Sequence, residues 1–417
     1  MQQLNIAILS YRSAQFGGGQ GVYVKDISYR LSQMGYSVDV ISGPPYPDLD
    51  KSINLIKLPG LNLFETFSFK DRLNKFLNKK NKSLDDIYEF FSVLLGGFPE
   101  LKTFGFRANN FLIDNDKYDL IIDNQSLSYG MLEIQKRFPL IEIIHHPITF
   151  DFKFELAASN KIKYKISRYR WYSFLKMQKK VASKIRCIIS PSKSSKRGII
   201  NEFHCKEETI HVINNGLDTN EFSPIKGVKR IPYRLITTAS ADVPLKGLDF
   251  SLKALYLLKK EFPMTHLIVI GTIKENGHTE RLIEKLKIKE SVTFKSNLTK
   301  EDIAKEYSKS SISIVSSLYE GFGYPVIEAM SCAIPLIATN VSSIPELVGN
   351  FATLIKPKDE KTLSESIRKI FLDYKNFEEI ALKGREHIVK TFNWNKITKE
   401  YESIILKTIE EFKNADI

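Results

Sequence analysis

The chain has 417 residues, is 43% hydrophobic and carries a formal net charge of +13 at pH 7. The length predicts two to three domains, and the hydrophobic content excludes a disordered chain. No apolar run approaches the roughly 18 residues that a membrane-spanning helix needs, and three cysteines without CxxC spacing argue against a disulfide framework and a zinc site. A reducing, cytoplasmic setting fits this composition best.

The N-terminal segment has the pattern of a strand, a turn and a helix. The first residues have no basic leader and no small-residue cleavage site, so a signal peptide is not expected there. The apolar residues 4–9 instead predict a first strand. A glycine-rich turn at 13–21 leads into a helix with apolar residues spaced by three and four, and 38–41 predicts a second strand. This is the start of a Rossmann-like domain. The glycines read GGGxG rather than GxGxxG, and Ser-Gly-Pro-Pro rather than an acid follows the second strand, so NAD binding is not expected.

Residues 61–115 interrupt this alternation with a stretch rich in phenylalanine and leucine. We expect helices here, and two interpretations remain open. The stretch is either a packed helical insertion or one wall of an apolar groove for a ligand.

Two further predicted strands end in polar residues. The first is 118–125, and the second, 140–147, ends at His145 and His146. Open α/β sheets bind ligands beyond the carboxyl ends of their strands, so both histidines are candidate site residues. Neighbours on a strand face opposite ways, which argues against a metal site built from this pair. Which histidine faces inward stays open, as does a purely structural role for both.

The segment from Ser159 to Arg197 contains no aspartate or glutamate but many lysines, arginines and aromatic residues. Three interpretations remain open for this basic, helical stretch. It contacts an anionic membrane surface, it is a solvated basic face, or it binds another polyanion. No RNA- or DNA-binding motif is present, so nucleic acid is not an expected partner.

A second Rossmann-like domain follows a linker near Pro224. Its predicted strands alternate with helices, as expected for a parallel sheet. These strands are 235–238, 267–270, 292–294, 312–315 and 336–338.

The segment Glu320-Gly-Phe-Gly-Tyr-Pro-Val-Ile-Glu328 lies between the predicted strand 312–315 and a predicted helix. A strand–turn–helix arrangement points backbone N–H groups and the positive end of a helix dipole at whatever occupies the turn, which suits phosphate. Gly321 and Gly323 allow the backbone to come close to such a ligand. The two glutamates can accept hydrogen bonds from sugar hydroxyls.

This segment, continued through 329–339 and 344–349, resembles the glutamate-x7-glutamate motif of the retaining GT-B-fold glycosyltransferases of the group 1, or family-four, class. The resemblance implies an α/β fold with two Rossmann-like, doubly wound domains facing a central cleft and a C-terminal helix that returns to the first domain. The expected domains are an acceptor-side domain at 1–224 that includes the insertion 61–115, a nucleotide-sugar domain at 225–393 and the C-terminal helix at 394–417.

The resemblance also implies roles for individual residues. In the family, the first glutamate and a histidine contact the sugar, the turn amides and a lysine hold the diphosphate, the second glutamate binds ribose, and the N-terminal glycines contact the donor. The catalytic candidates are therefore His145, His146 and Glu320. The donor-binding candidates are Gly18, Gly19, Lys246, Gly321, Phe322, Gly323 and Glu328.

One departure from the family pattern concerns the phosphate loop at 238–247, where the family has an arginine as well as a lysine. Lys246 is present, but Ala239 and Ser240 stand near the place of the arginine. How the charge of the leaving diphosphate is fully met stays open, with Lys193 and Arg197 as candidates.

The implied reaction is retaining transfer of a sugar from a nucleotide diphosphosugar to an acceptor hydroxyl, in glycolipid or polysaccharide synthesis. The acceptor is a glycan, a lipid-linked sugar or a small molecule, and the aromatic insertion raises the option of an apolar acceptor groove. No metal or other cofactor is expected, because no suitably placed DxD run is present. The expected location is the cytoplasm, with peripheral contact to the inner face of a membrane left open. Two other functions also stay open, a nucleotide-sugar epimerase and a degenerate nucleotide-sugar-binding protein.

Overall fold

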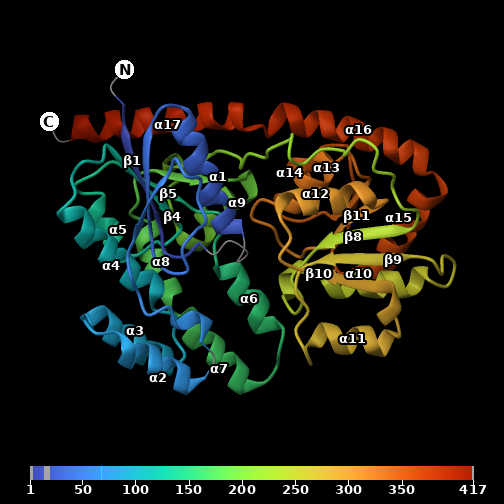
Figure 1. Cartoon of the computed structure of the whole chain (residues 1–417), viewed down its shortest axis with the longest axis horizontal. Helices are drawn as coiled ribbons and strands as arrows, with labels where there is room; N and C mark the ends of the chain where they lie inside the picture. The colour runs from blue at the N-terminus through green and yellow to red at the C-terminus, as the bar shows by residue number, and fades with distance from the viewer. Residues whose placement is uncertain (1–2, 14–18, 67, 416–417) are drawn as a thin grey trace. The chain divides into compact units, whose positions relative to one another are not determined.

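The computed structural model describes residues 3–13, 19–66 and 68–415. The chain divides into two compact units, and each is described by itself (Figure 1). The first unit contains residues 1–213 and 398–417, and the second contains 214–397.

The first unit is built on a parallel sheet with strand order β3-β2-β1-β4-β5-β6-β7. Its strands are β1 (Asn5–Ser10), β2 (Ser37–Ser42), β3 (Asn54–Lys57), β4 (Leu120–Asn124), β5 (Leu140–Ile143), β6 (Ile188–Ser190) and β7 (Ile210–Val212). The central strands are continuous apolar runs, as expected where helices cover both faces of a parallel sheet. The strand order reverses between β1 and β4, which is the position where ligands bind in such sheets.

Helices connect these strands. They are α1 (Gly19–Gln33), α2 (Phe69–Asn78), α3 (Leu84–Leu94), α4 (Glu100–Ile113), α5 (Tyr129–Ile134), α6 (Thr149–Ala157), α7 (Ile162–Trp171), α8 (Leu175–Ala182) and α9 (Lys193–Phe203). Short 3-10 turns are η1 (Leu63–Glu65), η2 (Tyr172–Phe174) and η3 (Glu207–Thr209). The phenylalanine-rich stretch 61–115 thus contains η1, α2, α3 and α4, and the acid-free stretch contains α7 and α8.

The last helix, α17 (Trp394–Ala415), completes the core of the first unit. Tyr401 and Ile405 on this helix are buried, with at most 1% of their surface exposed. The hydroxyl oxygens of Tyr401 and Tyr23 lie 2.7 Å apart, and Thr408 Oγ1 donates to Cys187 Sγ. The expected return of the C-terminal helix to the first domain is confirmed.

The second unit has a parallel sheet with strand order β10-β9-β8-β11-β12-β13. Its strands are β8 (Arg234–Thr238), β9 (His266–Ile270), β10 (Val292–Lys295), β11 (Ile312–Val315), β12 (Leu336–Thr339) and β13 (Thr353–Ile355). Its helices are α10 (Leu248–Leu258), α11 (His278–Leu286), α12 (Lys300–Lys309), α13 (Tyr324–Ser331), α14 (Ile344–Val348), α15 (Glu360–Leu372) and α16 (Tyr374–Thr391), with 3-10 turns η4 (Pro244–Lys246) and η5 (Lys289–Ser291).

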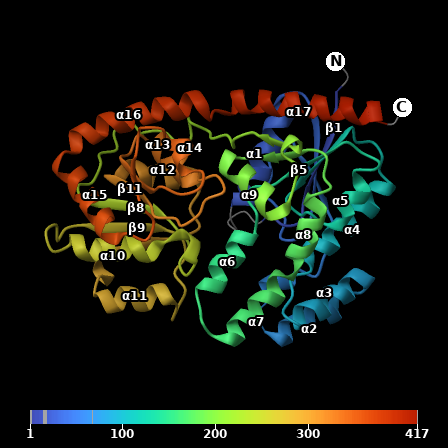
Figure 2. The same cartoon turned by 180° about the vertical axis from the view of Figure 1, so that it is seen from behind.

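Alternate residues of the second sheet enter two separate cores. Ile236 of β8 packs in the core that contains α13, whereas its neighbour Leu235 packs in the core that contains α10 and α15. The sheet is therefore buried on both faces, and Figure 2 shows α13 and α14 above its strands and α10 and α11 below them. Two doubly wound α/β units were expected from the sequence, and this expectation is confirmed.

Candidate functional site

In the second unit, the turn between β11 and α13 carries the residues that the sequence singles out. Gly323 caps α13 with a φ of +111°, a conformation that glycine adopts readily, and Pro325 lies in the first turn of the helix. Glu320 is 8% exposed at the start of the turn. The arrangement is a strand, a tight turn and a helix N-terminus, as the sequence predicts.

Hydrogen bonds from the segment that follows β11 and from the N-cap of α14 fix this turn. Ser317 Oγ donates to Glu320 Oε1 over 2.7 Å. Ser343 Oγ lies 2.9 Å from the carbonyl oxygen of Glu320 and 2.5 Å from that of Phe322. The backbone of the turn is therefore held by hydrogen bonds from side chains of two neighbouring segments.

Lys246 reaches the same turn from the loop after β8. Its Nζ lies 2.8 Å from Glu320 Oε1, and both side chains are largely shielded from solvent. A cation beside a carboxylate in such a setting forms a strong, charge-assisted hydrogen bond. The structure thus brings Lys246 to the turn that contains Glu320, which lies 74 residues further along the chain.

Gly247 allows the loop that carries Lys246 to lie close to Ser316, which follows β11. Its φ is +62°, and a Cβ at this position would lie 2.0 Å from the carbonyl oxygen of Ser316. Ser316 Oγ also donates to the carbonyl oxygen of Gly247, and the N–H of Leu318 donates to that of Leu245. These contacts fix the backbone on both sides of Lys246 and so orient its side chain.

The place of the family arginine contains no cation. Ala239 is buried and Ser240 is exposed in the loop after β8. The two alternative cations considered from the sequence, Lys193 and Arg197, lie on α9 of the first unit.

Glu328 lies in the second turn of α13 and is partly exposed. Tyr307 Oη donates to Glu328 Oε2 over 3.4 Å and lies 3.1 Å from Thr238 Oγ1 at the end of β8. Burial, followed by the nearby Glu328 carboxylate, raises the pKa of Tyr307 well above its ordinary value, so the phenol stays a hydrogen-bond donor. Sequence reasoning did not identify Tyr307, because nothing local to it marks a site.

In the first unit, His145 follows β5 and its ring is held on two sides. Its Nε2 lies 2.8 Å from Asn124 Oδ1, and the ring packs edge-on against Tyr23 with a centroid separation of 4.8 Å. The backbone N–H of His145 donates to Gln125 Oε1. Burial, followed by the charge of neighbouring His146, lowers the pKa of His145 to about 3, so the imidazole is neutral at physiological pH.

His146 has different partners. Its Nε2 lies 2.8 Å from Asp151 Oδ2 in the first turn of α6, and its carbonyl oxygen accepts from Gln125 Nε2. The His146 and Asp151 side chains are 26% and 31% exposed, so this pair can be reached by a ligand. Sequence reasoning missed Gln125 and Asp151, although the polar end of β4 was recognised.

A buried carboxylate shapes the loop that carries Gln125. Asp123 Oδ2 accepts from the N–H groups of Ser126 and Leu127 and from Ser126 Oγ. The loop turns sharply here, with φ values of +58° at Gln125 and +48° at Leu127. Asp123 thereby fixes the glutamine that holds the backbone of both histidines.

A pocket of about 180 Å³ adjoins the partners of these histidines. Gln125 and Asp151 line it together with an aromatic cluster. That cluster consists of Phe64, Phe98, Trp171, Tyr172 and Phe174. Of the two candidate glycines at the N-terminal turn, Gly19 begins α1 and is exposed, and Gly18 lies outside the described residues.

In the part of the chain that the structure describes, no group of three or more His, Cys, Asp or Glu side chains is arranged to hold a metal ion. Within residues 3–13, 19–66 and 68–415, no helix is both long and apolar enough to cross a membrane. The three cysteines are free and buried.

Two family models match the chain. The model described as "Glycosyl transferases group 1" matches residues 221–387, and the model described as "Glycosyltransferase Family 4" matches residues 17–221. The α-(1→4)-mannosyltransferase named for MMP from Mycolicibacterium hassiacum is 36% identical over 412 residues, which cover 97% of this chain and 98% of that protein. A probable sucrose-phosphate synthase from Thermosipho melanesiensis is 25% identical over 94% of this chain and 91% of its own length.

Solved structures share the fold. Sucrose-phosphate synthase from Thermosynechococcus elongatus superposes with a TM-score of 0.76 at 19% identity, covering 98% of this chain and all of that one. The Anabaena protein HepE, solved with UDP and glucose, gives a TM-score of 0.70 at 17% identity, covering 97% of this chain and all of that one.

Proposed function

Because this chain belongs to the group 1 glycosyltransferases, we propose that it is a retaining enzyme that moves a mannosyl group from a nucleotide diphosphosugar to an acceptor hydroxyl. The choice of mannose is supported by the 36% identical relative, which is named as an α-(1→4)-mannosyltransferase. An α-linked product made from an α-linked donor would require retention at the anomeric carbon. The solved neighbour that holds UDP and glucose supports a nucleotide-linked donor.

The observation that carries this proposal is the contact between Lys246 and Glu320 at the N-terminus of α13. Transfer places negative charge on the departing diphosphate and positive charge on the sugar. Lys246 and the amides of the turn 321–323 would stabilise the diphosphate, because fixed donors at a helix N-terminus need little rearrangement as charge develops. Glu320, released from the lysine, would accept hydrogen bonds from the sugar.

In the proposed reaction, the bond between the anomeric carbon and the phosphate oxygen breaks while the acceptor oxygen bonds to that carbon on the same face. The acceptor proton passes to the departing phosphate oxygen, so no carboxylate nucleophile is needed. Glu328 would bind the ribose of the nucleotide, with Tyr307 Oη donating to its carboxylate. No metal or other cofactor takes part in this proposal.

Of the two histidines, we assign the contact with the sugar to His146. The ring of His145 is occupied by Asn124 and Tyr23, both of which are buried. A neutral imidazole of such low pKa would not act as a general acid at neutral pH. His145 is therefore a positioning residue, and His146, oriented by Asp151, faces the ligand.

The test begins with a donor screen. Thermal shifts with GDP-, UDP- and ADP-linked mannose and glucose should select one donor, and nuclear magnetic resonance of the product should show the anomeric configuration of the donor. Glu320→Gln should abolish most transfer, whereas Lys253→Ala, a substitution on α10, should leave it unchanged. Product formation without any acceptor would instead favour an epimerase. Binding without transfer or hydrolysis would favour a degenerate binding protein.

Peripheral membrane contact is a second proposal, favoured by α7. Ile162, Ile166 and Tyr169 follow each other at intervals of four and three residues and are 75%, 47% and 61% exposed. Neighbouring bases include Lys161, Lys163, Lys165 and Arg170. An exposed apolar stripe flanked by bases is typical of helices that lie on anionic bilayers.

A vesicle assay addresses this second proposal. The protein should sediment with phosphatidylserine-containing vesicles at low salt and be released at high salt, since charge attraction is screened. The double change Ile162→Ser and Ile166→Ser should weaken sedimentation, and Ile113→Ser, at an exposed position of α4, should not. Failure to sediment at low salt would exclude the membrane contact and leave the transferase proposal unaffected.

A further inference from the structure

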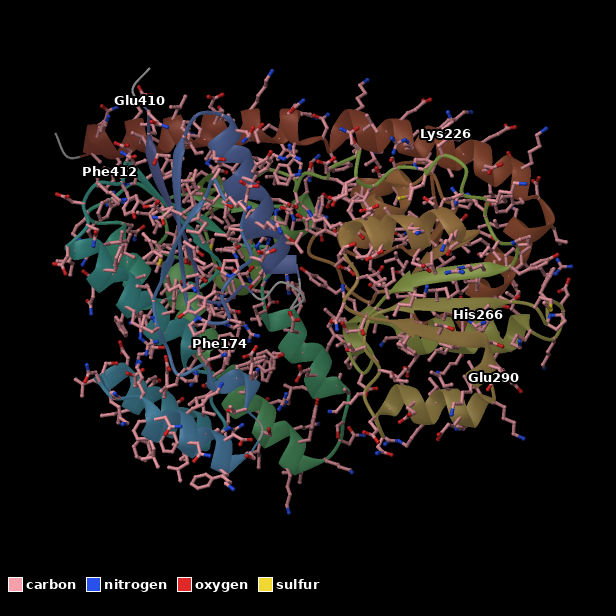
Figure 3. All side chains as sticks on the ribbon, viewed as in Figure 1. Phe174, Lys226, His266, Glu290, Glu410 and Phe412 are labelled. Carbon is pink, nitrogen blue, oxygen red and sulfur yellow. The ribbon has the colours of Figure 1, made fainter. Side chains whose placement is uncertain are left out.

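The aromatic cluster of the first unit forms one wall of the 180 Å³ pocket. Phe98 stacks on Trp171 with ring centroids 5.0 Å apart and an interplanar angle of 26°. The ring centroids of Phe64 and Trp171 are 5.8 Å apart, and those of Phe98 and Phe174 are 5.6 Å apart. Phe174 is labelled in Figure 3. These rings come from the phenylalanine-rich stretch and from the acid-free stretch. The two segments whose roles the sequence left open therefore meet in a single pocket.

The lining of the pocket also includes polar residues, and one of them has a side-chain oxygen that finds no hydrogen-bond partner among the described residues. Gln178 of α8 lines the pocket and is only 1% exposed. Its Nε2 lies 3.5 Å from the carbonyl oxygen of Ser126, whereas its Oε1 has no hydrogen-bond partner in the described part of the chain. A buried carbonyl oxygen without a donor is costly, so a ligand hydroxyl that donates to it after a small rotation of the Gln178 side chain would be favoured.

Two other polar residues of the lining contact the histidine pair. Gln125 and Asp151 both line the pocket, and the same two side chains hold the backbone and ring of His146. A ligand in the pocket would therefore lie next to the histidine that we assign to the sugar contact. This places the pocket on the acceptor side of the proposed reaction, within a single unit of the structure.

We propose that this pocket binds the acceptor, and that the acceptor is a sugar carrying an apolar alkyl or aryl group. This inference rests on the proposed transferase function. The apolar group packs against Phe98 and Trp171, while a sugar hydroxyl donates to Gln178 Oε1 and others reach Asp151. At about 180 Å³ the pocket is smaller than typical drug-sized sites of about 300–1,000 Å³, so it accepts one compact unit rather than a long chain.

Charge argues against an anionic acceptor such as a sugar phosphate. Among the described residues that line the pocket, Arg12 is the sole cation, and its guanidinium lies over the ring of Phe64 at 3.7 Å from the centroid. Asp151 lies on the same lining. A phosphate in this pocket would lose its hydration, pack against aromatic rings and lie near the Asp151 carboxylate, with Arg12 as its one cationic partner among the described lining residues. Such a transfer is unfavourable.

The experiment compares acceptors with the full chain and the donor selected by the screen. Methyl α-mannoside, p-nitrophenyl α-mannoside, free mannose and mannose 6-phosphate serve as probes. We expect the aryl glycoside to have the lowest acceptor KM. Trp171→Ala should raise that KM by about tenfold and reduce the preference for aryl over methyl glycoside, because the stacking surface is lost. Gln178→Leu should raise the KM for both glycosides alike.

Controls separate acceptor binding from folding and from donor binding. Phe69→Ala, which removes an exposed aromatic side chain of α2, should leave the acceptor KM unchanged. Trp171→Phe should restore much of the preference if stacking, rather than the fold, is responsible. Nucleotide affinity, measured by calorimetry, should be the same in wild type and in both Trp171 variants.

Two outcomes would overturn the inference. The first is a preference of the wild type for mannose 6-phosphate, and the second is an unchanged aryl-to-methyl ratio in Trp171→Ala. Calorimetric binding of p-nitrophenyl α-mannoside requires no turnover. If no donor is used but the glycoside binds in a Trp171-dependent way, the transferase proposal fails while the pocket assignment stands. If transfer is normal but does not depend on Trp171, the pocket assignment fails while the transferase proposal stands.

Discussion

Lys246 Nζ lies 2.8 Å from Glu320 Oε1, so two groups expected to contact the donor form an ion pair with each other. Ser317 Oγ also donates to this carboxylate, and the backbone of Glu320 is tied to Ser343. Glu320 is therefore the fixed partner and Lys246, on a flexible side chain that is 31% exposed, is the one that can turn toward a diphosphate.

Replacing Lys246 with Met should weaken nucleoside diphosphate binding by about 10- to 100-fold, since a hydrogen bond to a charged group contributes about 1.5–3 kcal/mol. Isothermal titration calorimetry with the selected nucleoside diphosphate measures this directly. Lys253→Met on α10 is the matched control and should bind like the wild type. Equal affinities for the two variants would contradict the role assigned to Lys246.

Glu320→Gln should separate binding of the diphosphate from transfer of the sugar. Removing the carboxylate charge frees Lys246, so the nucleoside diphosphate without its sugar should bind as tightly as in the wild type or more tightly. The transfer rate should nevertheless fall strongly, because the sugar loses a charged acceptor. A variant that loses diphosphate affinity would show that Glu320 holds the loop together rather than the sugar.

Gly247→Ala should be far more destabilising than Gly227→Ala. Both glycines have positive φ, so both substitutions place a Cβ in a conformation that costs about 1–2 kcal/mol. At Gly227 the Cβ meets open space, whereas at Gly247 it lies 2.0 Å from the carbonyl oxygen of Ser316 and forces the segment after β11 away from the loop that carries Lys246. That clash should add about 1–3 kcal/mol, measurable by urea unfolding, and should also weaken nucleotide binding.

Stability should fall on mild acidification, in part through His145. The pKa of His145 is about 3 in the folded protein, whereas a histidine in an unfolded chain has a pKa near 6.5. Between these two pH values the unfolded chain binds a proton that the folded chain does not. This contribution is fully present above pH 6.5 and is lost as pH falls, with a limiting slope of about 1.4 kcal/mol per pH unit. Unfolding curves for wild type and His145→Gln from pH 5 to 8 give the difference.

The comparison between these two proteins isolates His145. Burial also lowers the pKa values of His211 and His266, but those two histidines contribute equally to both proteins. The His145→Gln variant should therefore show a shallower loss of stability below pH 6.5. Parallel curves for the two proteins would mean that His145 is accessible to protons in the folded state.

Tyr401→Ala should destabilise the first unit by about 3–5 kcal/mol, because it leaves a large cavity and deprives the Tyr23 hydroxyl of a partner. Leu406→Ala, on the exposed side of the same helix, should change stability by no more than about 0.5 kcal/mol. Hydrogen exchange of β1 and β4 amides would locate the effect in the first unit. A Tyr401→Ala protein as stable as Leu406→Ala would show that α17 is dispensable to that core.

The residues of the turn that we propose to contact the donor could be selected from the sequence because their geometry is local. Residues 320–328 are consecutive, and a strand followed by glycines and a helix fixes where their amides point. Lys246, by contrast, is a candidate only through the resemblance of its loop to the family's phosphate loop, and its contact with Glu320 depends on the tertiary fold. Tyr307 could not be found in this way, since its contact with Glu328 depends on the packing of α12 against α13.

The pocket that we propose for the acceptor could not be predicted, for the same reason. Phe64, Phe98 and Trp171 are far apart along the chain, and only the tertiary fold stacks their rings. The sequence indicated an aromatic insertion and a basic aromatic segment but not their contact. Asp151 is only five residues from His146, yet no periodic pattern indicates that a helix start aims it at the ring.

The return of α17 to the first unit also constrains how the protein is made. The second unit, 214–397, is continuous in sequence, so all of its residues have been synthesised before α17 is complete. The first unit begins the chain but lacks Tyr401 and Ile405, which are buried in its core, until synthesis has passed the whole second unit. The half that leaves the ribosome first is therefore the half whose core closes last, and its unfinished apolar surface is what a chaperone would meet during translation.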